Sequence, residues 1–283
     1  MSKAIFLCSI CNVSSGSCSE DCGFCTQSAH HNVDINKYTY KMIEQIVQEA
    51  KKASENGAIG FCLVTSGKGL DSKKLTYICD AAKAVRSELP NIHLIACNGI
   101  ATVEQLCELK EAGVNSYNHN LESSHSFYKK LCSTHSWEER YQTCLNIKEA
   151  GLFLCSGGIF GLGESREDRR DFLECLQALQ PQTMPINFYH PNPALPIKAA
   201  PLSEEEALEI IIETKKMLPN TTLMIAGGRE ITFKKNPMGI FEAGADAIVL
   251  GDYLTTQGEL PKKDLQMILS CGYTIATSCH QQE

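Results

Sequence analysis

Short runs of apolar and mostly β-branched residues recur along the chain, separated by more polar segments. Eight of these runs stand out: Ile5–Ile10, Ile59–Val64, Ile92–Cys97, Val114–Tyr117, Leu152–Ile159, Met184–Tyr189, Thr222–Ala226 and Ala247–Leu250. Because nearly every position in them is apolar, they suit parallel strands that are buried on both faces better than half-exposed antiparallel strands. The pattern therefore predicts eight parallel strands.

Most of the intervening segments carry apolar residues at helical spacing together with helix start and stop signals. The first repeats apolar residues from Met42 to Ala50 and meets Gly57 as a cap. Four later segments begin with a capping-box pattern, at Thr102/Gln105, Ser136/Glu139, Ser165/Asp168 and Ser203/Glu206. Three end in the same phrase, Glu-Ala-Gly, at residues 111–113, 149–151 and 242–244. Each phrase is followed directly by a strand-like run, so it predicts a helix-to-strand turn.

Alternation of eight strands with helices predicts an α/β fold, and its strand count favours the (β/α)8 TIM-type barrel. A doubly wound open sheet is the alternative, because it gives the same alternation of elements. No linker or change of composition interrupts the 283 residues. We therefore expect a single domain over residues 1–283, with only its last few residues flexible.

Composition and charge narrow the class of protein. Hydrophobic residues make up 43% and charged residues 21% of the chain, which are ordinary values for a globular protein. A formal net charge of −7 and the lack of any Lys/Arg-rich run argue against a nucleic-acid partner. No apolar stretch approaches the ~18 residues of a membrane span, and the apolar part of the N-terminus is too short for a signal peptide. We therefore expect a cytoplasmic protein with no membrane partner.

Cysteine is over-represented, with 15 residues, and three of them form a CxxxCxxC pattern at Cys18, Cys22 and Cys25. Since disulfides are rare in a reducing cytosol, clustered cysteines there indicate metal or redox chemistry. Structural zinc sites usually take four protein ligands. Three thiolates around a [4Fe-4S] cluster would instead leave one iron open to a small molecule. Three packing cysteines placed together by chance are the structural alternative.

The CxxxCxxC pattern, with Phe24 before its last cysteine, resembles the cluster motif of the radical S-adenosylmethionine (AdoMet) superfamily. Residues 157–164, Gly-Gly-Ile-Phe-Gly-Leu-Gly-Glu, resemble the GxIxGxxE motif of the same superfamily. The resemblance implies that Cys18, Cys22 and Cys25 hold a [4Fe-4S] cluster whose open iron binds AdoMet. It also implies that Phe24 and Ile159 contact the adenine.

Further phrases are similar to those of one family within this superfamily, the biotin synthases. They occur in the family's order at Ser19–Ser28, Tyr117–Glu122, Cys155–Ile159, Pro185–Asn187, Ala226–Glu230 and Leu254–Thr256. The resemblance implies a sulfurtransferase that inserts sulfur into dethiobiotin to form biotin, with a second, [2Fe-2S] cluster as the sulfur source. It also implies a low-potential electron donor such as flavodoxin or ferredoxin, iron–sulfur assembly partners and a homodimer.

By resemblance, the ligands of the second cluster are Cys62, Cys97, Cys155 and Arg229. The three cysteines lie in different predicted strands, and Arg229 follows the seventh. Side chains from different strands converge inside a barrel, so these residues could share one centre. Each cysteine alone would be read as buried packing. An arginine directed into a barrel needs an anion or a metal centre, because burying an unpaired guanidinium is costly.

The resemblance also assigns the small-molecule contacts. Those to AdoMet are Asn120, Glu122 and Arg140, with His190 near the adenine; a surface salt bridge is the alternative for Arg140. Those to the substrate are Asn118, Asn120, Asn187, Thr255 and Thr256. Asn118 and Asn120 are two residues apart at a strand end, so both amides point to one side. The chain departs from the family in the sequence after Asn187 and at Gly60, where some relatives have an arginine.

The remaining cysteines are assigned to packing or to the flexible end: Cys8, Cys11, Cys79, Cys107, Cys132, Cys144, Cys175, Cys271 and Cys279. Cys8 and Cys11 lie close to the cluster loop in the sequence, so a role at the cluster stays open for them. Two other functions stay open on the sequence. One is another AdoMet-radical enzyme with two clusters, such as a hydrogenase-maturation protein, against which the asparagine pair and the threonine pair argue. The other is a non-catalytic iron–sulfur or zinc scaffold, which would leave residues 157–164 unexplained.

Overall fold

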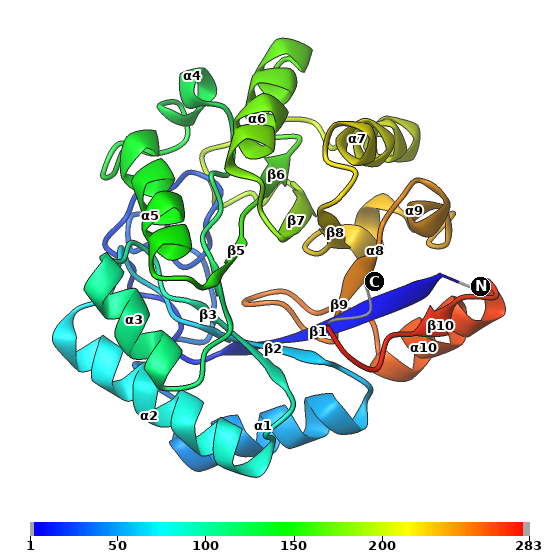
Figure 1. Ribbon diagram of the computed structural model, residues 1–283. Helices are drawn as coiled ribbons and strands as arrows, with labels where there is room; N and C mark the ends of the chain where they lie inside the picture. The colour runs from blue at the N-terminus through cyan, green and yellow to red at the C-terminus, as the bar shows by residue number, and fades with distance from the viewer. Residues whose placement is uncertain (1–2, 280–283) are drawn as a thin grey trace.

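A closed barrel of parallel strands forms the centre of the computed structural model, which describes residues 3–279 (Figure 1). Its strands are β1 (Ala4–Asn12), β2 (Gly60–Val64), β3 (His93–Cys97), β4 (Ser116–Asn118), β5 (Phe153–Cys155), β6 (Gly158–Phe160), β7 (Thr183–Phe188), β8 (Thr222–Ile225) and β9 (Ala247–Leu250). β1 pairs with β2 on one side and with β9 on the other, which closes the sheet. The predicted barrel is confirmed, and the open sheet is excluded because its two edge strands would not pair.

The helices surround this barrel on the outside (Figure 1). They are α1 (Ile43–Glu55), α2 (Ser72–Glu88), α3 (Val103–Glu111), α4 (His125–Tyr128), α5 (Trp137–Glu149), α6 (Arg166–Leu179), α7 (Glu204–Met217), α8 (Arg229–Thr232), α9 (Gly239–Glu242) and α10 (Pro261–Ser270). A short further strand, β10 (Thr274–Ile275), pairs with the start of β1 outside the barrel and was not predicted.

The predicted strand Leu152–Ile159 is wrong as one element, because it divides into β5 and β6. β5 meets β7 only at Cys155 and Thr183, whereas β6 pairs with the last half of β7. The chain steps sideways at Gly157, where an added Cβ would lie 2.0 Å from the carbonyl oxygen of Pro185. A residue without a side chain is therefore required where the two backbones approach.

Three of the four predicted capping boxes are present, at the starts of α3, α5 and α6. At α7, Ser203 accepts from the backbone N–H of Glu206, but the reciprocal side-chain bond is missing, so that box is only half right. The repeated Glu-Ala-Gly phrase ends its helices as predicted. Its three glycines all have positive φ: +100° at Gly113, +68° at Gly151 and +122° at Gly244.

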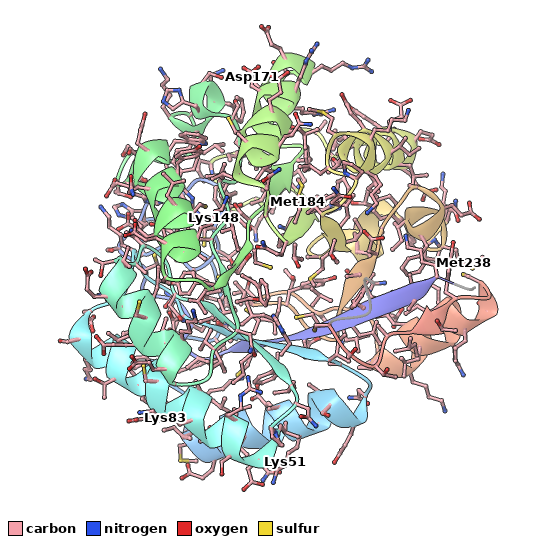
Figure 2. All side chains as sticks on the ribbon, in the orientation of Figure 1. Lys51, Lys83, Lys148, Asp171, Met184 and Met238 are labelled. Carbon is pink, nitrogen blue, oxygen red and sulfur yellow. The ribbon has the colours of Figure 1, made fainter. Side chains whose placement is uncertain are left out.

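Most of the apolar core lies between the barrel and the helices, and it includes Met184 of β7. Figure 2 shows Met184 within the molecule, whereas Lys83 of α2 and Asp171 of α6 lie on its outer surface. A second, small cluster lies inside the barrel and comprises Cys8, Cys62, Val64 and Ile95. The interior is thus only partly filled by side chains, and two of its buried members are thiols.

Within residues 3–279, no helix has the length and apolar character needed to cross a membrane. The flexible terminus that the sequence predicts includes residues 280–283, which lie outside the described residues. Cys279, assigned to that terminus, lies against the N-terminal end of the barrel in a cavity that Phe6 and Thr222 also line.

Replacing Gly157 tests the sideways step between β5 and β6. We expect Gly157→Ala to lower the free energy of unfolding by more than about 2 kcal/mol, because the new methyl group meets backbone that cannot move aside. Gly251→Ala is the matched control: it has φ +72° but nothing within 4 Å of the added Cβ. It should lower the free energy of unfolding by only about 1 kcal/mol, the cost of placing a residue with a Cβ in the left-handed conformation. Equal losses in urea unfolding of the two variants would contradict the close approach.

Candidate active site in the barrel

Two neighbouring cavities open at the end of the barrel where the strands finish. The barrel cavity, about 330 Å³, lies between the strands, and the loop cavity, about 170 Å³, lies between the barrel and the loop after β1. Both are lined by the same six residues: Val64, Cys97, Asn118, Asn120, Glu122 and Leu254. A ligand in one cavity is therefore separated from a ligand in the other by one layer of side chains.

Most residues predicted for the second cluster and the substrate line the barrel cavity. They are Cys62, Cys97, Cys155, Asn118, Asn120, Asn187, Thr255 and Thr256. They come from β2, β3, β4, β5, β7 and the segment after β9. Convergence of parallel strands brings them together from positions spread over almost 200 residues of sequence.

The loop cavity collects the residues predicted for the first cluster and for AdoMet. Its lining includes the three motif cysteines and four of the six AdoMet candidates: Cys18, Cys22, Cys25, Phe24, Asn120, Glu122 and Arg140. Among the described residues, no three thiol sulfurs lie within 4.8 Å of one another. The group of potential metal ligands that does lie within this distance in the described part of the chain is Cys22, Cys132 and His135.

Hydrogen bonds fix the cysteine loop against the segment that follows α4. The carboxylate of Asp21 accepts from the backbone N–H groups of Ser133 (2.9 Å) and Thr134 (3.2 Å). The N–H of Gly23 donates to the carbonyl of Leu131 at 2.7 Å. These bonds favour the ionised carboxylate and lower the pKa of Asp21, although burial opposes the shift. The loop is thus held in place by protein contacts before any ligand is bound.

A group that sequence reasoning missed lies beside this loop. The sulfur of Cys132 is 3.6 Å from that of Cys22 and 3.2 Å from Nδ1 of His135, whose Nδ1 also lies 2.7 Å from the carboxylate of Glu20. The Cys22 thiol donates to Cys132, which lowers the pKa of Cys132 to about 4 and raises that of Cys22. We assigned Cys132 to packing, and no spacing in the sequence links it to a partner 110 residues away.

Arg140 is directed inward, which excludes the surface salt bridge. Its Nη2 lies 3.2 Å from the carboxylate of Glu122, and the two side chains are only 12% and 11% exposed. Its Nε donates to the carbonyl of Asn120 at 2.6 Å. Burial raises the pKa of Glu122, and Arg140 opposes that shift. Glu122 also has φ +68°, a conformation that is costly for a residue with a side chain and that is frequent at functional sites.

The amides of the barrel cavity differ in what they can still bind. Asn187 is committed to the protein, donating to the carbonyl of Gly158 and accepting from the N–H of Gly227. Asn118 donates to the sulfur of Cys97 at 3.3 Å, but its buried Oδ1 has no partner within residues 3–279. An orphaned buried acceptor costs about 1–3 kcal/mol. Asn118 therefore fits a ligand that brings an N–H donor into this cavity.

Three predicted site residues do not line either cavity. Arg229 is buried, and its two terminal nitrogens donate to both carboxylate oxygens of Asp264 in α10, each at 2.8 Å. Ile159 packs beside Phe24 in a small apolar cluster next to the loop. His190 lies 3.0 Å from the hydroxyl of Thr232 in α8.

The strand cysteines of the barrel cavity are buried or nearly so, and burial raises the pKa of each thiol. Buried thiols are therefore protonated unless a cation compensates the charge of the thiolate. A metal centre supplies that compensation and displaces the protons. The donor set of the cavity thus fits an iron–sulfur cluster.

Comparison with known families assigns the class. The model of the radical SAM superfamily matches residues 12–176, and that of the biotin and thiamin synthesis associated domain matches residues 185–274. Solved structures with the same fold include a methylornithine synthase (TM-score 0.81, 18% identity, 96% of this chain and 84% of that one). Another is an FeFe-hydrogenase maturase from Carboxydothermus hydrogenoformans (TM-score 0.82, 18% identity, 99% of this chain and 70% of that one). At such identity they show the fold alone. The fold and the cysteine loop thus define a radical SAM barrel.

Curated relatives identify the family within that class. A biotin synthase from Nitratiruptor sp. is 58% identical over 277 residues, covering 98% of this chain and 99% of the relative. One from Campylobacter jejuni is 57% identical over 276 residues, with 98% and 99% covered. The chain belongs to the biotin synthase family. The resemblance inferred from the motifs is confirmed.

Removing the partner of Arg229 tests its structural role. We expect Asp264→Ala to lower the free energy of unfolding by about 3–5 kcal/mol, because it leaves a buried guanidinium without its bidentate partner. Glu174→Ala breaks an exposed ion pair with Arg170 and serves as the control, with an expected loss within about 0.5 kcal/mol. Both are measured by urea unfolding of the metal-free, reduced protein. A loss for Asp264→Ala as small as the control's would show that Arg229 is not held in this way.

Proposed function

We propose that this chain catalyses the insertion of sulfur into dethiobiotin to form biotin. The observation that carries the proposal is the pair of cavities joined through Asn118, Asn120 and Cys97. One cavity offers three thiols in a loop, and the other offers thiols on separate strands. A substrate bound at this junction would contact both centres. The reaction requires this, because the carbon whose C–H bond is cleaved must then form a C–S bond.

In this proposal Cys18, Cys22 and Cys25 hold a [4Fe-4S] cluster, and Cys62, Cys97 and Cys155 hold the second cluster. When bound, the clusters and AdoMet supply the reducing electron, the hydrogen-abstracting chemistry and the sulfur. The loop cavity binds AdoMet through Phe24, Asn120, Glu122 and Arg140. Ile159 and His190, which do not line the loop cavity, contact the adenine only after a rearrangement on AdoMet binding.

The chain's own task is to bind, orient and exclude water. Asn118, whose Oδ1 is unpaired in the described chain, accepts a ureido N–H of the substrate. Asn187 supports the wall beside it, and Thr255 and Thr256 hold the carboxylate. Val64 and Leu254, which line both cavities, give the junction an apolar wall. Exclusion of water along this wall limits side reactions of reactive species.

The proposal extends to the partners that this chemistry needs. A low-potential donor such as flavodoxin or ferredoxin supplies electrons, and iron–sulfur assembly proteins rebuild the second cluster after its sulfur is donated. The protein acts in the cytoplasm as a homodimer of single-domain subunits.

Cys22→Ala tests the first cluster site. We expect loss of AdoMet cleavage, because removing one of three thiolates strips the cluster or its redox access. The measurement is 5′-deoxyadenosine formed by the reconstituted protein with a chemical reductant. Cys79→Ala is the control: Cys79 is also buried but lies in α2 and lines neither cavity. If Cys22→Ala forms 5′-deoxyadenosine at the rate of that control, the cluster assignment is wrong.

Cys155→Ala separates sulfur donation from radical generation. Cys155 lines the barrel cavity but not the loop cavity, so its replacement removes no side chain from the lining of the loop cavity. We expect the variant to form 5′-deoxyadenosine yet no biotin, with both products measured in the same reaction. Biotin at the yield of the unmodified protein would mean that the sulfur comes from elsewhere.

A further inference from the structure

The placement of Arg229 leaves the barrel cavity one ligand short of the expected set. The guanidinium of Arg229 is engaged by Asp264 and Glu230 and does not line the cavity. The wall of β8 is instead formed by Met224, whose thioether is only a weak acceptor. Because four protein ligands are the usual set of an iron–sulfur cluster, three cysteines leave the second cluster without its fourth donor.

A fourth cysteine lines the same cavity. Cys8 of β1 is 5% exposed and belongs to the small apolar cluster inside the barrel with Cys62. In the parallel pairing of β1 with β2, Ile10 lies opposite Cys62, and Cys8 is two residues before Ile10 on the same face. Side chains two apart on a strand point the same way, so Cys8 and Cys62 face the interior from adjacent strands.

The residue opposite Cys8 leaves room for its sulfur. Gly60 pairs with Cys8, and a Cβ on Gly60 would lie 3.2 Å from the Cys8 sulfur. Any side chain at position 60 would press on that sulfur, whereas glycine lets it extend over β2. The departure from the family noted at Gly60 thus coincides with the thiol at Cys8.

The other donors of the barrel cavity are less suited. The carboxylate of Glu122 is paired with Arg140, and the amide of Asn187 is saturated by backbone groups. Thiolates are the usual ligands of iron–sulfur clusters, and four cysteines are the usual set. Cys8, Cys62, Cys97 and Cys155 all line this cavity of about 330 Å³.

We propose that the thiolate of Cys8 is the fourth protein ligand of the second cluster, in the position that the family resemblance gives to Arg229. The inference rests on the proposed function, because it presumes that the barrel cavity holds a cluster. Ligation exchanges the S–H bond for an S–Fe bond and releases the thiol proton to solvent, with no change in oxidation state. Arg229 then serves as a structural residue that joins α8 to α10.

The test isolates the second site in the full-length chain. A parent variant with Cys18, Cys22 and Cys25 all replaced by Ala is reconstituted anaerobically with ⁵⁷Fe and sulfide, so that bound iron reports on the barrel cavity alone. Iron and sulfide per chain are counted and Mössbauer spectra recorded. Cys8→Ala, Cys8→Ser, Cys11→Ala, Cys279→Ala and Arg229→Lys are compared in this background. Cys11 is the matched control, because it is buried on the same strand but belongs to the core outside the barrel.

We expect Cys8→Ala to lose most of the iron and sulfide that the parent holds. Cys8→Ser, which keeps a donor atom at nearly the same place but replaces sulfur with oxygen, should retain a cluster with an altered spectrum. Cys11→Ala, Cys279→Ala and Arg229→Lys should match the parent in both measurements. Circular dichroism of the metal-free variants checks that each is folded.

The proposal is overturned if both Cys8 variants keep the parent's iron content and spectrum, or if Arg229→Lys or Cys279→Ala alters the spectrum instead. In those cases the proposed function stands, since the cavity still holds a cluster. A parent that binds no iron and sulfide overturns both the Cys8 ligand and the proposed function. The two failures are therefore distinguishable.

Discussion

Closure of the barrel between β1 and β9 is the constraint on which the site depends. β1 carries Cys8 inside the barrel and leads directly into the cysteine loop, while β9 leads into the segment with Thr255. Pairing of the two strands brings these segments together, and the hydroxyls of Thr26 and Thr255 lie 2.7 Å apart. The side chain of Asn12 also donates to the carbonyl of Leu254 at 2.8 Å. Closure of the sheet thus places Leu254, which lines both cavities, beside the cysteine loop.

Inside this closed sheet, stability and function compete. The interior holds buried thiols and the unpaired carbonyl of Asn118, where a barrel built for stability alone would hold branched apolar side chains. Burial disfavours thiolates, so the metal-free protein carries protonated thiols at these positions. Binding of metal centres therefore contributes to the stability of the folded chain as well as to its chemistry.

Much of the fold could be predicted from the sequence because its signals are local. Eight buried runs, capping boxes and the Glu-Ala-Gly phrase each act over a few residues, and nearly all were confirmed. The division of Leu152–Ile159 was not predictable, because it depends on contact between Gly157 and Pro185 across the sheet. The site followed the same rule. Residues on strands converge by topology. Arg229 instead lies in α8, which begins after Gly228 with φ +84°, and it points away from the barrel cavity to pair with Asp264, 35 residues further on.

The central claim is that one barrel holds two different centres and that the inner one supplies sulfur. Mössbauer spectra with iron and sulfide analysis, recorded before and after a single turnover with dethiobiotin, AdoMet and reductant but no added sulfide, test it most directly. The account predicts two iron environments at the start. After turnover, the environment held by Cys18, Cys22 and Cys25 persists, and the inner one loses sulfide in proportion to the biotin formed. Biotin formation with both environments unchanged would contradict the account.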